Sequence, residues 1–143
     1  MIVKDHHYWM QKAISQAEIG ETAYGAVIVN ENDQFIEAFN TVKQDGSTAH
    51  AEINVIQRLK ELEVTDALKL KLYTTVEPCP MCMGAIIWAG IGLVAYGASI
   101  EDAALYGNQI NITAQEMIKQ SWYSIHLIPE VAREQCVSLL QKY

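Results

Sequence analysis

The sequence predicts a single mixed α/β domain over residues 1–143, with a central five-stranded sheet and helices on both of its faces. The first observation is that strand-like and helix-like segments alternate after an opening hairpin, which is typical of layered α/β domains. The second is the length of 143 residues, which is that of one domain. The third is composition: 50% of residues are hydrophobic and 19% are charged, which excludes a disordered chain.

The first half of the chain predicts a helix, a hairpin and a second helix. Apolar positions such as Trp9 lie on one side of the first helical segment, and Gly20 follows as a stop signal. A turn at Asn32-Asp33 separates two strand-like runs, so this part reads as a hairpin. The expected elements are a helix over 5–19, strands over 24–30 and 34–40, a polar loop over 41–48 and a helix over 50–62.

The second half contains an uncharged stretch of 23 residues, 78–100, which is long enough to cross a bilayer. Glycines interrupt it, acidic residues flank it, and it divides into a helix-like and a strand-like part. We therefore expect a buried helix and a buried strand, and no membrane partner. The expected elements are a strand over 69–76, a helix over 80–89, a strand over 92–97, a helix over 113–120, a strand over 123–128 and a helix over 130–141.

Charge and cysteine content limit the classes of function. With 17 acidic and 10 basic residues the formal net charge is −7, which argues against a large nucleic-acid surface. The cysteines are Cys79, Cys82 and Cys136, and an odd number without a secretory leader favours the reducing cytoplasm over a disulfide framework. Cys136 is expected to be an apolar core residue of the last helix.

Two short motifs contain the candidate metal-binding and catalytic residues, His50-Ala51-Glu52 and Pro78-Cys79-Pro80-Met81-Cys82. Cys79 and Cys82 are three positions apart at the start of a helix, so both sulfurs face the same way, and the helix N-terminus favours thiolates. With His50 they make three Zn²⁺ ligands and leave a fourth position for water, as in a catalytic site. Glu52 would contact that water without ligating the metal.

The combined pattern resembles the H-x-E … P-C-x-x-C signature of the zinc-dependent cytidine/deoxycytidylate deaminase superfamily. The chain is most similar to the branch that holds bacterial guanine deaminases and tRNA adenosine deaminases, over roughly residues 5–110. The matching residues are Gly25-Ala26-Val27-Ile28-Val29, Asn40, Thr48-Ala49-His50-Ala51-Glu52 and Glu77-Pro78-Cys79-Pro80-Met81-Cys82-Met83-Gly84-Ala85-Ile86. The resemblance implies a three-layer α/β/α cytidine deaminase-like fold.

The resemblance also implies a reaction, the hydrolytic deamination of a heterocycle by a zinc-bound hydroxide, with release of ammonia. Glu52 would act as general acid and base, while His50, Cys79 and Cys82 hold Zn²⁺. Asn40 and the backbone N–H of Ala51 would contact the substrate. The family commonly forms dimers, so a homodimer is expected.

Other interpretations of these residues stay open. Cys79 and Cys82 also fit a redox pair or a closed structural zinc site, and Asn40 could cap its loop. Trp88 is either a core residue or a wall of the pocket. Glu101 and Asp102 read as a helix start or a solvated turn. The polar candidates for a substrate pocket in the second half are Asp102, Asn108 and Glu116.

The substrate is expected to be a free nucleobase, with guanine favoured. The chain lacks the basic C-terminal helix usual in tRNA adenosine deaminases, while Trp88 and Asp102-Ala103-Ala104…Gly107 resemble guanine deaminases. Ile110 departs from that group, which has an acidic residue there, so another acid such as Glu116 would have to orient guanine. The alternatives are a tRNA-specific adenosine deaminase, a cytosine, pterin or triazine deaminase, and a non-catalytic zinc module, which Glu52 opposes.

Overall fold

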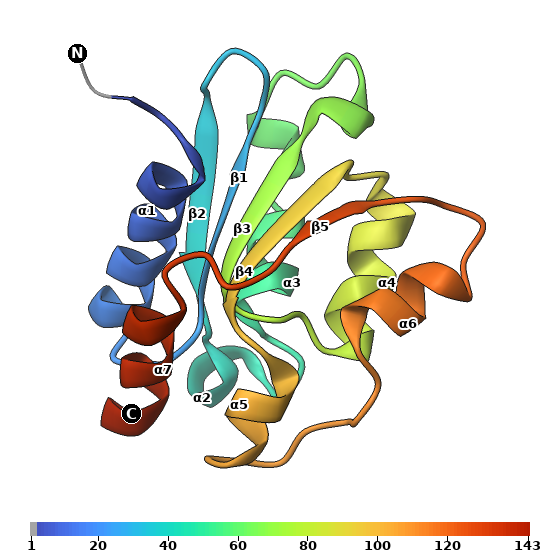
Figure 1. Ribbon diagram of the computed structural model, residues 1–143. Helices are drawn as coiled ribbons and strands as arrows, with labels where there is room; N and C mark the ends of the chain where they lie inside the picture. The colour runs from blue at the N-terminus through green and yellow to red at the C-terminus, as the bar shows by residue number, and fades with distance from the viewer. Residues whose placement is uncertain (1–2) are drawn as a thin grey trace.

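The computed structural model describes residues 3–143 and contains one five-stranded mixed sheet with the strand order β2-β1-β3-β4-β5 (Figure 1). Strand β1 is antiparallel to both of its neighbours, whereas β3, β4 and β5 run parallel. The predicted five-stranded sheet is therefore confirmed. The strands are β1 (Gly25–Val29), β2 (Phe35–Phe39), β3 (Lys71–Val76), β4 (Leu93–Ala98) and β5 (His126–Ile128).

Helices cover both faces of the sheet, as predicted (Figure 1). Helices α1 and α7 lie on one face, and α3, α4 and α6 lie on the other. The α-helices are α1 (His6–Ile19), α2 (Val42–Asp45), α3 (Ala51–Ile56), α4 (Pro80–Ala89), α5 (Ile100–Ala104), α6 (Ala114–Lys119) and α7 (Arg133–Lys142). Short 3₁₀ turns occur at Leu59–Glu61 and Ala67–Lys69.

Strand β1 is apolar at every position because both of its faces are covered by helices. All five of its residues are buried, because helices cover both sides. Ala26 and Ile28 belong to the core beneath α3 and α4, while Val27 and Val29 belong to the core beneath α1 and α7. Alternate side chains of a strand point to opposite faces, so this one strand contributes to both cores.

The sequence overestimated the helix over 50–62. Helix α3 ends at Ile56, and the chain turns so that Leu62 is buried in the core. Arg58 donates a hydrogen bond to the Glu37 carbonyl oxygen of β2 (2.7 Å) and pairs with Glu61. The expected loop over 41–48 contains the short helix α2, and the C-terminal helix begins later than expected, at Arg133.

The uncharged stretch 78–100 consists mainly of helix α4 and strand β4, as expected. Helix α4 has ten residues and packs against α3 and α6. Within residues 3–143, no helix combines the length and the apolar character needed to cross a bilayer. The Cys136 side chain is buried in the core of the α1–α7 layer, which confirms its predicted place.

Candidate active site

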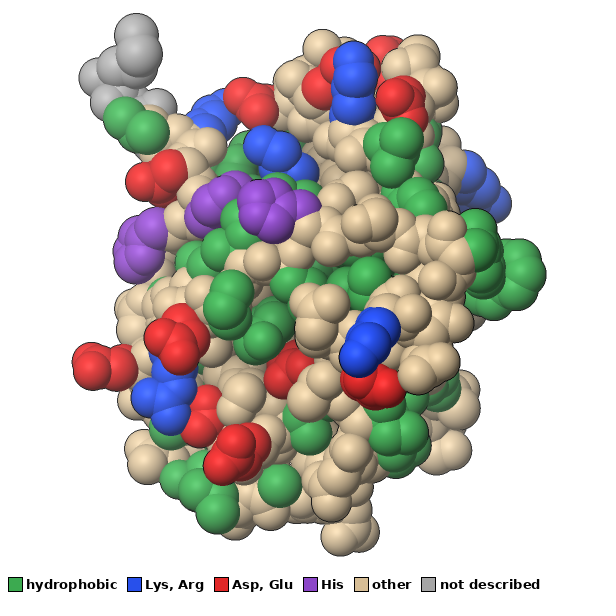
Figure 2. Space-filling view, turned by 45° about the vertical axis from the view of Figure 1, so that its right-hand side comes forward, with side chains coloured by type: hydrophobic (Ala, Val, Ile, Leu, Met, Phe, Trp, Pro, Cys, Tyr) green, Lys and Arg blue, Asp and Glu red, His purple; other side chains and the backbone are tan. Residues whose placement is uncertain are grey.

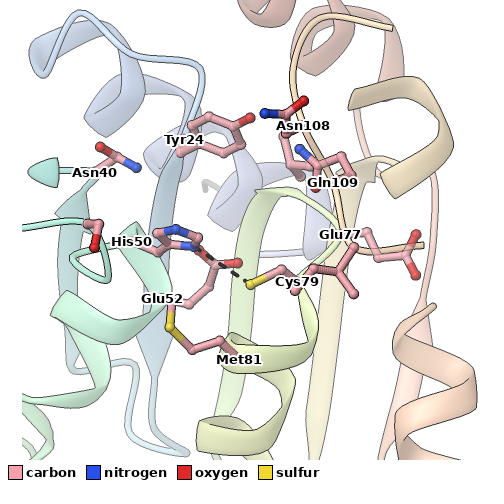
Figure 3. Close-up of a pocket in the computed structure, with 12 residues that line it drawn as sticks. Tyr24, Asn40, His50, Glu52, Glu77, Cys79, Met81, Asn108 and Gln109 are labelled. Carbon is pink, nitrogen blue, oxygen red and sulfur yellow. Dashed lines mark hydrogen bonds between the residues drawn. The ribbon is translucent and has the colours of Figure 1, made fainter. Parts of the chain in front are cut away.

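The structure brings His50, Cys79 and Cys82 together at the beginnings of two adjacent helices. His50 has an extended backbone and directly precedes α3, while Cys79 directly precedes α4 and Cys82 lies in its first turn. Pro80 takes the first helical position, where its missing N–H costs no hydrogen bond. The sharp entry into each helix therefore directs the imidazole and both sulfurs toward one point. Figure 3 shows His50 beside Cys79.

The spacing of these three side chains fits a zinc ion. His50 Nδ1 lies 3.7 Å from Cys79 Sγ and 3.5 Å from Cys82 Sγ. With Zn–S near 2.3 Å and Zn–N near 2.0–2.1 Å, a tetrahedron places neighbouring ligand atoms roughly 3.5–3.8 Å apart. The three residues thus form a possible zinc site.

The electrostatics of the cluster favour a cation. A hydrogen bond from the Cys82 thiol, opposed by burial and aided by His50, lowers the pKa of Cys79 to about 4. The same bond, together with burial, raises the pKa of Cys82. A bound cation would replace the proton that the two sulfurs share, as is usual for thiolate ligands.

Glu52 is the buried carboxyl group of the site, at 5% exposure. It lies in the first turn of α3, and in Figure 3 its carboxyl group lies near His50 and Cys79. Burial raises the pKa of Glu52 to about 7, an effect that the neighbouring Cys79 reinforces. A carboxyl group with such a pKa can both accept and donate a proton near neutrality.

A cavity of about 310 Å³ opens beside these residues. It is lined by amide, hydroxyl and apolar side chains in addition to the cluster, and none of its described lining residues is Lys or Arg. The lining comprises Tyr24, Asn40, Ser47, His50, Glu52, Val76, Glu77, Cys79, Met81, Asn108, Gln109 and Ile110.

Two of the predicted substrate contacts line this cavity. Asn40 Oδ1 accepts a hydrogen bond from the Val42 N–H (3.1 Å), so the Asn40 amide nitrogen stays available to donate. The expected loop cap and a substrate contact are thus compatible. Asn108 lines the opposite side (Figure 3). Ala51 is fully buried at the first position of α3 and is not a lining residue.

Three other predicted candidates lie elsewhere. Trp88 is neither core nor pocket wall: it is 79% exposed at the end of α4, where its ring contacts Trp122 at 4.8 Å between centroids. Asp102 forms the capping box of α5 and pairs with Arg133 at 2.7 Å, so it is a helix start. Glu116 is exposed on α6 and accepts a hydrogen bond from Gln120. None of the three is among the residues that line the cavity.

Three residues of the cavity lining were not predicted from the sequence: Tyr24, Gln109 and Glu77. Burial raises the pKa of Tyr24, and the nearby Gln109 side chain opposes this shift. Both residues line the cavity (Figure 3). Tyr24 directly precedes the buried strand β1, so the start of this strand places its side chain at the cavity beside His50 and Cys79. Glu77 stood next to the cysteine string, but its partners come from much later in the chain.

Comparison with known proteins agrees with this geometry. Guanine deaminase of Bacillus subtilis (strain 168) is 37% identical over 124 residues, which cover 80% of this chain and 78% of the relative. A tRNA-specific adenosine deaminase of Buchnera aphidicola (subsp. Baizongia pistaciae) is 33% identical over 142 residues, which cover 95% and 86%. The solved guanine deaminase of Nitrosomonas europaea superposes with a TM-score of 0.82 over all of this chain and 86% of its own, at 20% identity, which supports the fold.

A family profile described as the cytidine and deoxycytidylate deaminase zinc-binding region matches residues 3–98. This range contains His50, Glu52, Cys79 and Cys82, the residues that the structure brings together. The chain is therefore a member of the cytidine and deoxycytidylate deaminase family.

Proposed function

We propose that this protein hydrolyses the exocyclic C–NH₂ bond of a free nucleobase, with guanine as the favoured substrate. The observation that carries the proposal is the buried Glu52 carboxyl group beside three metal ligands at the floor of a base-sized cavity. A zinc ion held by His50, Cys79 and Cys82 would supply Lewis-acid activation of water.

Glu52 performs the proton transfers in this scheme. It accepts a proton from the attacking water, whose oxygen bonds to the ring carbon that bears the amine. Glu52 then passes this proton to the adjacent ring nitrogen. It next takes the remaining proton from the new hydroxyl group and delivers it to the amine, so that the carbonyl forms, the C–N bond breaks and ammonia leaves. Its pKa of about 7 suits both directions of transfer. Asn40 donates its amide N–H to an acceptor on the ring.

The cavity supports a small neutral substrate. Its volume of about 310 Å³ is at the small end of ligand pockets and suits a single ring system. Without Lys or Arg among its described lining residues, it offers no cation to a phosphate group. The similarity to a Bacillus subtilis guanine deaminase supports guanine in particular.

Ammonia release from a panel of bases tests this proposal. Zinc-loaded protein is incubated with guanine, adenine, cytosine, a pterin, a triazine and the corresponding nucleosides. Release from guanine above all others supports the proposal. Ammonia release from another base alone would make that base the substrate in place of guanine. No ammonia release from any compound of the panel would contradict free-base deamination.

Deamination of adenosine in tRNA is the second candidate, because a tRNA-specific adenosine deaminase matches 95% of this chain. The net charge of −7 opposes it, and Figure 2 shows blue basic side chains standing apart on the visible face rather than gathered in a patch. Tight binding of an anticodon stem-loop that weakens steeply with salt would favour this candidate.

We further propose a homodimer in the cytoplasm. Trp88 and Trp122 are 79% and 69% exposed and contact each other, and large exposed aromatic side chains commonly mark interaction surfaces. Light scattering should give twice the chain mass for the wild type and a lower mass for Trp88→Lys. A wild-type monomer would refute the dimer, and fractionation of cells tests the compartment.

A further inference from the structure

One segment supplies much of the cavity wall that faces the metal cluster. We define the outer wall as residues 105–113, the connection between α5 and α6. It contributes Asn108, Gln109 and Ile110 to the cavity lining, yet it forms no helix or strand. All of its residues are exposed except the half-buried Gln109, so packing alone holds this wall weakly.

The buried carboxylate of Glu77 anchors the starts of α5 and α6, the helices that precede and follow the outer wall. Glu77 is 6% exposed. Its Oε1 accepts a hydrogen bond from the Ile100 N–H (3.0 Å), and its Oε2 accepts one from the Ala114 N–H (2.8 Å). These are the first residues of α5 and α6, whose N–H groups have no partner within their own helices. One side chain therefore satisfies the two helix starts that bracket the wall.

The place of Glu77 in the chain links this anchor to the site. Glu77 lies two residues before Cys79, and its own N–H donates to the Ala98 carbonyl oxygen at 2.7 Å. The loop that carries a metal ligand and the outer wall are thus fixed to the same residue. Gln109 of the wall lines the same cavity as Glu52 and Tyr24 (Figure 3).

We propose that Glu77 is a positioning residue, which fixes the outer wall so that Gln109 holds the substrate against Glu52. This inference rests on the proposed function. Glu77 acts through the wall rather than on the substrate, since both of its oxygens already accept backbone hydrogen bonds and little of its surface is exposed.

The test begins with Glu77→Gln. The amide keeps the shape but turns one acceptor into a donor, so one helix-start N–H faces another N–H. The loss of a hydrogen bond to a charged group is expected to raise KM about tenfold while kcat stays within about threefold. Hydrogen exchange in peptides spanning residues 100–114 should also accelerate about tenfold. Glu101→Gln is the matched control, because Glu101 is exposed on α5 and should behave as the wild type.

A second variant, Ala114→Pro, tests the same anchor if Glu77→Gln fails to fold. It removes one donor and keeps the carboxylate, at a first helical position where proline is tolerated. The preceding residue, Thr113, is already extended (φ −73°, ψ 158°), as a residue before proline must be. The same rise in KM and in exchange is expected.

A double-mutant cycle separates positioning from general destabilisation. If Glu77 acts through Gln109, Glu77→Gln should lower kcat/KM much less in a Gln109→Ala background than in the wild type. An unchanged exchange rate, an unchanged KM or an undiminished loss in the Gln109→Ala background would each overturn the proposal. If the wild type deaminates no heterocycle, the proposed function fails, and the exchange measurement alone decides whether Glu77 anchors the wall.

Discussion

Thr75 joins two strands through its side chain, and its replacement by valine tests the account of how the sheet positions the site. Thr75 is fully buried in β3. Its hydroxyl donates to the Ala23 carbonyl oxygen (2.7 Å) and accepts from the Gly25 N–H (3.1 Å), and Tyr24 of the cavity lies between these two residues. Thr75→Val keeps the side-chain shape and removes both hydrogen bonds.

The loss of stability in Thr75→Val comes from the Ala23 carbonyl oxygen and the Gly25 N–H, which both lose their hydrogen-bond partner. A buried backbone group without a partner costs about 1–3 kcal/mol. The methyl group that replaces the hydroxyl recovers part of this loss, because it is cheaper to bury. We therefore expect the free energy of unfolding to fall by about 2–4 kcal/mol. For a chain of this length, that corresponds to a drop in Tm of roughly 6–15 °C.

Urea unfolding followed by circular dichroism measures this change. Thr65→Val is the matched control, because Thr65 is exposed and makes only a long contact with Glu31 (3.4 Å), so its effect should stay within about 0.5 kcal/mol. If Thr75→Val were as stable as Thr65→Val, the bridge between β1 and β3 would not contribute as argued.

Further predictions concern the Asp102–Arg133 ion pair, the close packing of Gly25 against α1, and zinc binding. The pKa of Asp102 is lowered to about 2, mainly by Arg133. This pair should stabilise the fold above about pH 4 and lose its effect as pH falls toward 2. Asp102→Asn should therefore lower the free energy of unfolding by about 1–2 kcal/mol at pH 7. This value is kept low because Arg133 is 47% exposed and solvent screens the pair. A pH series of unfolding curves in which Asp102→Asn and the wild type lose stability alike would contradict this. In Gly25→Ala, the new Cβ would overlap the Ala13 carbonyl oxygen of α1, so we expect a loss of about 3 kcal/mol in urea unfolding, and wild-type stability would refute the close approach. Chelation of zinc should lower Tm in thermal unfolding, since a ligand that binds the folded state stabilises it, and an unchanged Tm would argue against binding at this site.

Local sequence spacing, together with the family resemblance that joins the two motifs, was enough to predict the core of the candidate site. Cys79 and Cys82 come from one helix start, and His50 and Glu52 from another, so the local geometry of a helix entrance, with its extended capping residue, sets each pair. The apolar runs of β1 and β4 likewise predicted buried strands. These features depend on neighbours within about one helical turn, which the sequence displays directly.

Features that depend on distant partners could not be predicted in this way. The anchoring role of Glu77 depends on its hydrogen bonds with the N–H groups of Ile100 and Ala114, which are 23 and 37 residues away. Trp88 is apolar and lies near the end of the largely buried helix α4, but its position on α4 turns it to the surface beside Trp122. Asp102 and Arg133 are 31 residues apart, so nothing local identified Asp102 as half of an ion pair.

The most direct test of the central claim compares zinc-loaded wild-type protein with Glu52→Gln, which keeps the shape of the side chain and cannot take a proton. Zinc content and the rate of ammonia release are measured on the same samples, with the exposed Glu116→Gln as control. We expect equal zinc in all three proteins, wild-type turnover in Glu116→Gln and a rate lower by about 10²–10⁴ in Glu52→Gln. Ammonia release by Glu52→Gln at the wild-type rate would contradict the role of Glu52 in proton transfer.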